Sequence, residues 1–425
     1  MTLTFSPAAH RRRRPRSLSP AALVALGFGR WTAYNLSEPT VTPFTFSTTR
    51  NVHFGAGRLA LIGDVVRDQI GRRVLLVTDP GMVRTGIVER TIVLLEAAGV
   101  AVTLFAEVEA DPPEPVILAA VEAARAAGAL GIVGLGGGSS LDVAKLVAVL
   151  ARGEEKLADI YGIGKVKGGR LPLLLVPTTA GTGSEVTPVS IVTTGTSEKM
   201  GVLSPVILPD IALLDPELTL GLPPHVTAAT GIDAMVHAIE AYASLGANNN
   251  PVSKLLAKEA LTLMGRSLLV AVQDGSDLDA RSAMMLGSML AGQAFANSPV
   301  AAVHALAYPL GGQFHIPHGL SNALVLPHVL RFNAEVAPDP YVELAPFAFP
   351  DLAAIDGSAR AFAFADRLAA LSADCGLPQS LAAMNIPREA LPRLAADAMR
   401  QTRLLGNNPR AVSEADALAI YSAAY

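Results

Sequence analysis

The chain is poor in several features that would each indicate a particular class of protein. Its 425 residues include one cysteine, Cys375, so no internal disulfide can form, and a reducing compartment, the cytoplasm, is the expected location. A formal net charge of −4 and only 16% charged residues give no sign of a nucleic-acid or anionic-membrane partner. No apolar run reaches the roughly 18 residues that a membrane-spanning helix needs. Small molecules are therefore the expected partners.

The first 43 residues differ in composition from everything that follows. Five arginines lie between Arg11 and Arg16, and no acidic residue precedes Glu38. An arginine-rich, acid-poor opening is typical either of a targeting segment or of a disordered or misassigned extension. We favour the extension and exclude residues 1–43 from the prediction of the fold.

Short apolar runs alternate with helix-like stretches between residues 44 and 220. The expected strands are Val74–Thr78, Val102–Phe105, Gly131–Leu135 and Leu171–Val176. The expected helices are Arg84–Ala98, Pro115–Ala127 and Leu141–Leu150. Such alternation is typical of a doubly wound parallel sheet, whose strands are apolar throughout because helices cover both faces. We therefore predict an α/β domain over residues 44–220.

The strand signal disappears in the second half of the chain. Helical patterns cover His225–Leu245, Pro251–Val272, Asp277–Phe295, Ser358–Leu371, Arg388–Arg400 and Ser413–Ser422. Two prolines in LGLPPHV break the chain near residue 220. We therefore predict a second, all-helical domain over residues 221–425.

Four residues of the helical half form a candidate metal site. Asp233 and His237 lie four apart in GIDAMVHAIEAY and therefore share one face of a helix. His304 and His318 lie farther along, and His304 stands in an apolar segment where an unpartnered imidazole would be costly. Three imidazoles and one carboxylate suit a divalent ion, either Fe²⁺ or Zn²⁺. His315 is either a substrate-side group or a surface residue.

A glycine run in the α/β half is a candidate phosphate site, although the GxGxxG fingerprint of dinucleotide-binding domains is absent. Gly136, Gly137 and Gly138 follow an expected strand and open an expected helix. Glycines let the backbone approach a phosphate, and the N–H groups of the helix start can then bind it. Asp142, in the first turn, is a further cofactor candidate, or it stabilises the helix dipole.

Two other strand ends carry polar groups. The loop PTTAGTGSEVT offers the hydroxyls of Thr178, Thr179 and Thr182 at the carboxyl end of an expected strand, where open α/β sheets bind ligands. Asp79 ends the strand VLLVTD, where a carboxylate can accept from ribose hydroxyls and repel a 2′-phosphate, or simply cap a helix.

Four motifs in order along the chain resemble those of the iron-containing (group III) alcohol dehydrogenases. They are GGGSSLDVAK, PTTAGTGSEVT, GIDAMVHAIEAY and HALAYPLGGQFHIPHGLSNALVLPH. The resemblance implies an N-terminal dinucleotide-binding domain and a C-terminal helical domain, the dehydroquinate synthase-like fold, with the site between them. It also implies a homodimer or larger homo-oligomer.

Carried over by position, the resemblance implies a role for each candidate. The implied metal ligands are Asp233, His237, His304 and His318. The implied contacts to NAD come from Asp79, Gly136, Gly137, Gly138, Ser139, Thr178, Thr179, Thr182 and Lys199. Asp79 would hold the adenine ribose and so favour NAD over NADP. Iron is the ion that the family implies, with zinc as the alternative.

Tyr308 departs from the family pattern. Many alcohol-active members carry a histidine at this position, four residues after the third metal ligand. A tyrosine hydroxyl can donate a hydrogen bond, but its ordinary pKa of ~10 makes it a poorer proton shuttle at neutral pH. The resemblance associates tyrosine here with branches that act on hydroxy acids such as 4-hydroxybutyrate. Tyr308 and His315 are therefore the candidate catalytic side chains.

The sequence predicts a metal-dependent, NAD-linked alcohol dehydrogenase that interconverts a small alcohol or hydroxy acid and its aldehyde or ketone. A hydroxyacid dehydrogenase or a maleylacetate reductase is an alternative on the same scaffold, although the reductase branch lacks the full ligand set. A lyase such as dehydroquinate synthase would need more basic residues around the ligands. A nucleotide-binding protein without activity would not need four ligands.

Overall fold

The computed structural model describes residues 42–195 and 198–425. The predicted N-terminal extension, residues 1–43, therefore lies outside the described residues except for its last two. Residues Phe44–Tyr425 form one compact unit, and the structural description concerns this unit.

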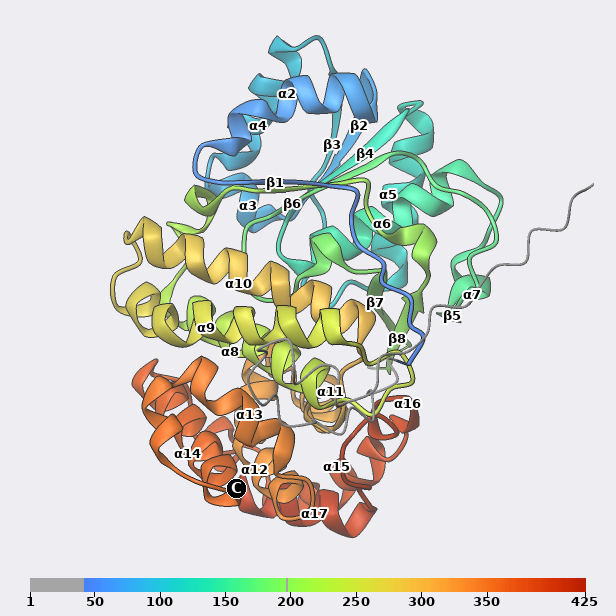
Figure 1. Ribbon diagram of the computed structural model, residues 1–425. Coiled ribbons are helices and arrows are strands. Elements are labelled where there is room, and N and C mark those ends of the chain that lie inside the picture. Colours follow the sequence, from blue (N-terminus) through green and yellow to red (C-terminus); the bar gives the residue numbers. More distant parts are fainter. Residues whose placement is uncertain (1–41, 196–197) are drawn as a thin grey trace, which may run out of the picture. The chain divides into compact units, whose positions relative to one another are not determined.

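A sheet of six parallel strands organises the first half of the described chain (Figure 1). Its order is β1–β9–β6–β4–β2–β3. The strands are β1 (Asn51–Phe54), β2 (Arg73–Val77), β3 (Ala101–Phe105), β4 (Gly131–Gly136), β6 (Leu173–Pro177) and β9 (Ile211–Leu214). Every residue of β4 and β6 is buried, as expected where helices cover both faces of a parallel sheet. The predicted doubly wound α/β fold is confirmed.

The helices of this half follow the strands, with one difference from the prediction. They are α2 (Ile62–Val65), α3 (Pro80–Arg84), α4 (Ile87–Ala97), α5 (Glu114–Ala126), α6 (Gly138–Arg152) and α7 (Leu157–Ile160). The helix expected over Arg84–Ala98 is instead divided between α3 and α4. Gly86 separates them with a φ of 79°, a left-handed conformation that glycine adopts without steric cost.

A small second sheet was not anticipated from the sequence. It consists of β5 (Gly162–Ile163), β7 (Val189–Thr194) and β8 (Glu198–Leu203). β7 and β8 pair in an antiparallel hairpin that follows the PTTAGTGSEVT loop. The hairpin therefore extends the loop beyond the edge of the main sheet.

Helices make up the rest of the described chain, and no strand follows Leu214 within the described residues. They are α8 (Pro224–Ala243), α9 (Pro251–Gln273), α10 (Leu278–Asn297), α11 (Ala302–Phe314), α12 (His318–Ala334), α13 (Asp339–Ala348), α14 (Ser358–Asp374), α15 (Leu391–Ala398), α16 (Thr402–Leu405) and α17 (Glu414–Ala423). The all-helical second half is confirmed. The domain boundary at residue 220 falls between β9 and α8 and stays a prediction.

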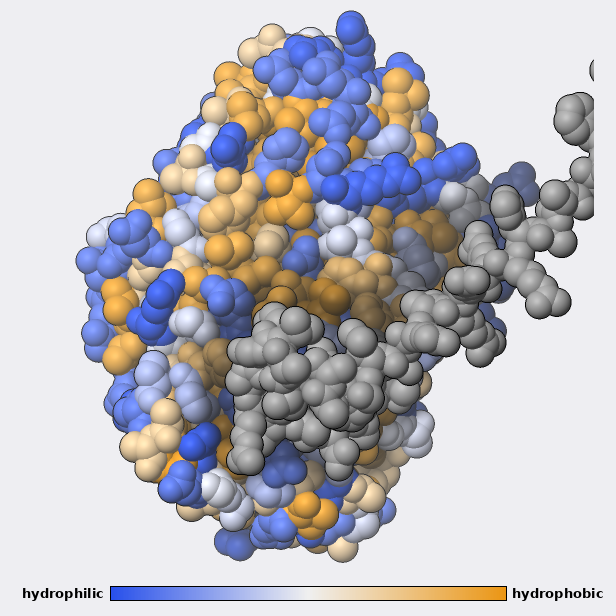
Figure 2. Space-filling view, viewed as in Figure 1, coloured by the Kyte–Doolittle hydropathy of each residue, from blue (hydrophilic) through white to orange (hydrophobic). Residues whose placement is uncertain are grey.

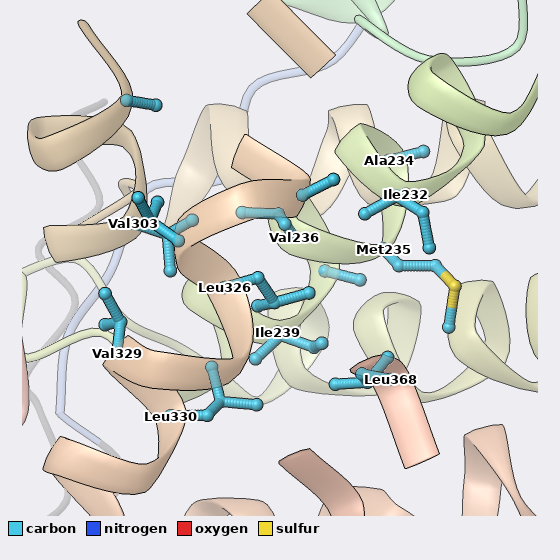
Figure 3. Close-up of a cluster of buried hydrophobic side chains, with 14 of the residues drawn as sticks. Ile232, Ala234, Met235, Val236, Ile239, Val303, Leu326, Val329, Leu330 and Leu368 are labelled. Carbon is cyan, nitrogen blue, oxygen red and sulfur yellow. The ribbon is translucent and has the colours of Figure 1, made fainter. Parts of the chain in front are cut away.

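Figure 3 shows the packing that fixes α8, the helix that carries the first two predicted metal ligands. Hydrophobic side chains from α8, α11, α12 and α14 meet in one buried cluster. The labelled residues are Ile232, Ala234, Met235, Val236, Ile239, Val303, Leu326, Val329, Leu330 and Leu368. Full burial of an aliphatic side chain stabilises a fold by about 1.5–3 kcal/mol. The position of α8 therefore depends on apolar packing rather than on its polar residues.

The surface agrees with the composition. Hydrophilic and hydrophobic residues are interspersed over the face shown in Figure 2. Among residues 42–195 and 198–425, none of the helices combines the length and the hydropathy that crossing a membrane requires.

Candidate metal and cofactor site

A cavity brings the predicted metal ligands and part of the glycine turn together. It has about 1380 Å³ of space, counting the part that opens to solvent. Gly138, Ser139 and Thr182 line it from the α/β half, and His304 and His318 are among the lining residues of the helical half. Residues that are far apart in the sequence thus line the same cavity.

The four predicted metal ligands converge in this cavity. Asp233 and His237 lie one turn apart on α8, His304 lies near the start of α11, and His318 is the first residue of α12. One donor atom from each residue lies within 4.8 Å of the donor atoms of the other three. Asp233, His237 and His304 are buried, whereas the side chain of His318 is 41% exposed. A divalent ion bound by all four would therefore stay accessible from the side of His318.

The protonation states suit a cation. Burial lowers the pKa of His237 to about 3, so its imidazole is neutral and keeps a lone pair for a metal. Burial alone would raise the pKa of Asp233, but the nearby imidazoles of His237, His318 and His304 lower it below its ordinary value. The carboxylate is consequently ionised at neutral pH. Imidazole nitrogens together with one anionic oxygen fit Fe²⁺ or Zn²⁺.

Two of the imidazoles are oriented by hydrogen bonds at Nδ1. Nδ1 of His237 lies 3.2 Å from the carbonyl oxygen of Gly181, and Nδ1 of His304 lies 2.7 Å from a carboxylate oxygen of Glu240. Both partners can only accept, so Nδ1 carries the hydrogen and Nε2 keeps its lone pair. This arrangement is common among metal-binding histidines because it fixes the tautomer and the ring orientation.

Glu240 is a site residue that the sequence analysis missed. Its carboxylate is 4% exposed and accepts from three donors: Nδ1 of His304 at 2.7 Å, the backbone N–H of Val303 at 2.6 Å and that of Ala301 at 3.0 Å. A signal was present, because an acidic residue inside the apolar stretch HAIEAYA must be paired when the helix is buried. Its partners, however, lie more than 60 residues away in the sequence.

Asn322, on α12, was also missed. Its Nδ2 donates to Asp233 at 2.6 Å and lies 3.3 Å from Nε2 of both His304 and His318. Its Oδ1 is buried and has no hydrogen-bond partner within the described residues. The amide therefore lies against the ligand atoms and orients the carboxylate of Asp233.

The glycine turn lies at the switch point of the sheet. β2 has β3 on one side and β4 on the other, so the chain reverses its direction of winding between β2 and β4. Ligands of open α/β sheets bind outside the carboxyl ends of strands at such points. Gly138 begins α6 there, and a Cβ added to it would lie 2.7 Å from Cγ2 of Thr182. The turn and the threonine loop are therefore packed together closely enough to require glycine.

Some predicted cofactor residues are hydrogen-bonded within the protein. Oδ1 of Asp79 accepts the backbone N–H of Met82 at 3.0 Å and caps α3, while Oδ2 accepts from Ser140 at 3.3 Å. Asp79 therefore lies beside the glycine turn, and its role as a cap is visible. Thr178 is 2% exposed, and its hydroxyl contacts the sulfur of Met82 at 3.4 Å. Thr179 is partly exposed at the start of the loop.

Two other candidates line the cavity with their charges already paired. Asp142 accepts from the hydroxyl of Ser184 at 2.6 Å and from the backbone N–H of Ile191 at 2.9 Å. Lys199 lies 2.7 Å from Asp111 and donates to Thr193. Asp142 thus holds the threonine loop to α6, and Lys199 links the hairpin to the segment that follows β3.

Lys145 has a structural role that the sequence analysis did not assign. It is fully buried, and its Nζ donates to Oγ of Ser184 and to the carbonyl oxygen of Val189, each at 2.7 Å. Burial lowers the pKa of Lys145, and Asp142, 3.5 Å away, opposes that shift. Lys145 therefore links α6 to the threonine loop and to the start of β7 through hydrogen bonds.

The structure separates the two candidate catalytic residues. Tyr308 lines the cavity, and its ring centroid lies 6.4 Å from that of His304 and 6.0 Å from that of His318. Burial raises the pKa of Tyr308 to about 12, so its hydroxyl stays protonated at neutral pH. His315 is exposed, ends α11 with a φ of 55° and does not line the cavity. His315 is therefore left out of the proposed site.

Comparisons with known proteins give matches in both halves of the chain. The family model "Iron-containing alcohol dehydrogenase" matches residues 49–216, and "Fe-containing alcohol dehydrogenase family, C-terminal" matches residues 227–425. Long-chain-alcohol dehydrogenase 1 of Geobacillus thermodenitrificans is 41% identical over 88% of this chain and 94% of its own length. Sulfoacetaldehyde reductase of Bilophila wadsworthia is 36% identical over 89% and 98%. A crystal structure of 1,3-propanediol oxidoreductase covers 90% of this chain and 100% of its own, with 34% identity and a TM-score of 0.87.

Proposed function

Because the chain belongs to the iron-containing alcohol dehydrogenase family, we propose that it interconverts a small alcohol or hydroxy acid and its aldehyde or ketone with NAD as the redox partner. One observation carries the proposal: four metal-binding side chains and the glycine turn of an α/β sheet meet at one cavity. Relatives are named for long-chain alcohols, sulfoacetaldehyde and 1,3-propanediol. Alcohols and aldehydes are thus the substrate class to test.

Asp233, His237, His304 and His318 would hold the metal, and iron is the ion that we propose on the family resemblance. A divalent ion at such a site supplies Lewis-acid polarisation of a substrate oxygen. The protein contributes the orientation: Glu240 and the carbonyl oxygen of Gly181 hold two imidazoles with Nε2 toward the cavity. The charge of Asp233 adds the anionic ligand that balances the cation.

The glycine turn and the start of α6 would hold the pyrophosphate of NAD, which supplies the hydride chemistry when bound. Gly138, Ser139 and Thr182 line the cavity and can offer backbone N–H and hydroxyl donors. Asp79, beside Gly136, would exclude a 2′-phosphate and so favour NAD over NADP.

Tyr308 would face the substrate. Because burial keeps its hydroxyl protonated, it can donate a hydrogen bond to a substrate oxygen but is a poor base. Phe295, Val300 and Ile316 form apolar walls of the cavity, which help to exclude water from the reacting atoms. The homodimer or larger assembly that the resemblance implies stays a prediction.

Replacing His237 with Ala tests the proposed function. The purified protein should hold a divalent metal and oxidise members of a panel of alcohols, diols and ω-hydroxy acids with NAD. His237→Ala should lose most of its metal by elemental analysis and its NAD-linked turnover, yet still bind NAD in a calorimetric titration. His225→Ala is the matched control, because His225 is exposed on the same helix. Normal turnover in His237→Ala would reject the assignment.

A further inference from the structure

Arg403 is a cation of the cavity whose charge is not neutralised by any residue that the structure describes. Arg403 is exposed and lines the cavity, and no described residue forms a hydrogen bond or an ion pair with its side chain. Lys199 also lines the cavity, but it is paired with Asp111 at 2.7 Å. Lys199 is therefore neutralised by an acidic residue of the protein, whereas Arg403 can bind an anionic ligand.

The carboxylates that line the cavity cannot serve Arg403. Asp111 is paired with Lys199, Asp142 is hydrogen-bonded to the threonine loop and the hairpin, and Asp233 belongs to the ligand set. Among the described residues, the five N–H donors of this planar guanidinium fork therefore have no anionic acceptor. That fork matches the two oxygens of a carboxylate or sulfonate.

Buried and hydrogen-bonded neighbours anchor the backbone at Arg403. The next residue, Leu404, is 1% exposed and anchors α16 in the core. Asn407 donates to the carbonyl oxygen of Val300 at 3.0 Å and accepts the backbone N–H of Leu245 at 2.7 Å. Val300 also lines the cavity, so the segment that follows Arg403 is hydrogen-bonded to the cavity wall.

Arg403 belongs to the substrate side of the cavity rather than to the glycine turn. The short helix α16, which carries Arg403, packs against α11, the helix that carries His304 and Tyr308. The glycine turn lies in the other half of the chain, on α6. A ligand that reaches from the metal site along the apolar wall can therefore meet the guanidinium at its far end.

We propose that Arg403 binds an anionic group on the substrate, so that the preferred substrates are hydroxy acids or sulfonates and their aldehydes rather than neutral alcohols. This inference rests on the proposed function and deepens it. The reacting end of such a substrate carries the alcohol or aldehyde, and the opposite end carries the oxyanion.

Paired substrates of equal length test the proposal. 4-Hydroxybutanoate and 1-butanol form one pair, and 5-hydroxypentanoate and 1-pentanol the other. Arg403→Met should lower kcat/KM for the hydroxycarboxylates by roughly tenfold to a hundredfold, the usual size of a lost charge-assisted hydrogen bond, and change the neutral alcohols less than about threefold. Arg403→Lys should lie between. Arg393→Met is the matched control, because Arg393 is exposed, lies outside the cavity and has no hydrogen bond or ion pair with the described residues.

The outcomes separate the inference from the function. If Arg403→Met lowers kcat/KM equally for the hydroxycarboxylate and the neutral alcohol of each pair, or changes neither, the proposed role of Arg403 is overturned. A raised KM for NAD alone would assign the guanidinium to the cofactor and overturn it as well. Calorimetry of the metal-loaded protein with butane-1-sulfonate, a weak metal ligand, supplies a readout without turnover. Binding that Arg403→Met abolishes supports the anion site even if no alcohol is oxidised, whereas absent binding rejects it.

Discussion

The two ends of the cavity differ in what they offer a ligand. The metal end, with Asp233, His237, His304 and His318, offers side chains, whereas the cofactor end, at the glycine turn, offers backbone. At the metal end, side chains would bind the ion, and buried partners such as Glu240 and Asn322 orient them. At the cofactor end, Gly138 lines the cavity, and we propose that the backbone of the glycine turn binds the ligand while side chains such as Lys145 and Asp142 hold the loops in place. A substitution at the metal end should therefore change metal affinity, and one at the cofactor end should change the KM for NAD.

Glu240→Gln should give the largest effect among the variants outside the ligands. Three N–H donors converge on the two carboxylate oxygens, so an amide NH₂ must face at least one of them and leave His304 or a backbone N–H unpaired. We expect a loss in metal affinity of roughly 10–100-fold, measured by competition with a chelator, and an unchanged dissociation constant for NAD. Glu343→Gln is the control. Glu343, on α13, accepts a hydrogen bond from Tyr242, which lies on α8 as Glu240 does, and neither Glu343 nor Tyr242 lines the cavity. Metal affinity equal to that of the control would show that Glu240 serves the fold alone.

Gly137→Ala tests the cofactor end of the cavity, at the glycine turn. A Cβ at Gly137 would meet no atom closer than 3.8 Å, whereas one at Gly138 would lie 2.7 Å from Thr182. Alanine at residue 137 should thus leave the fold and the metal content unchanged while it blocks the approach of a phosphate to the backbone. A rise of about tenfold in the KM for NAD is expected from one lost charge-assisted hydrogen bond. Gly138→Ala should raise the KM and also lower the melting temperature, which separates ligand contact from loop packing.

The metal site could be predicted only in part from the sequence. The pattern of Asp233 and His237 is local, because a spacing of four on a helix places both on one face. His304 and His318 were added to this pair as candidate ligands because of their residue type and apolar surroundings, but their convergence depends on the packing of α8, α11 and α12, which no local spacing describes. Glu240 shows the limit: its donors lie 61 to 64 positions away, so no local pattern reveals them.

Proline explains why two helices of the site were not assigned. Pro309 lies inside α11 and Pro327 inside α12, and a proline in a helix interior usually argues against a helix. Buried packing overrides that preference here. The same region explains His315, because the chain turns there with a left-handed residue, and the ring stays outside the cavity while His318, three residues on, reaches it.

Asp79→Asn should give the smallest effect and decide the role of one carboxylate at the cofactor end. The amide oxygen can still accept the N–H of Met82, and its NH₂ can donate to the hydroxyl of Ser140, so the cap of α3 is kept while the charge is removed. Loss of a repulsion of about 1 kcal/mol toward a 2′-phosphate should lower the preference for NAD over NADP, as a ratio of kcat/KM, by about fivefold. Asp79→Ala should change the ratio equally but also lose about 1 kcal/mol of stability, because the cap is gone. If Asp79→Asn keeps the ratio of the unaltered protein, Asp79 is a helix cap only, and selection between the two cofactors resides elsewhere.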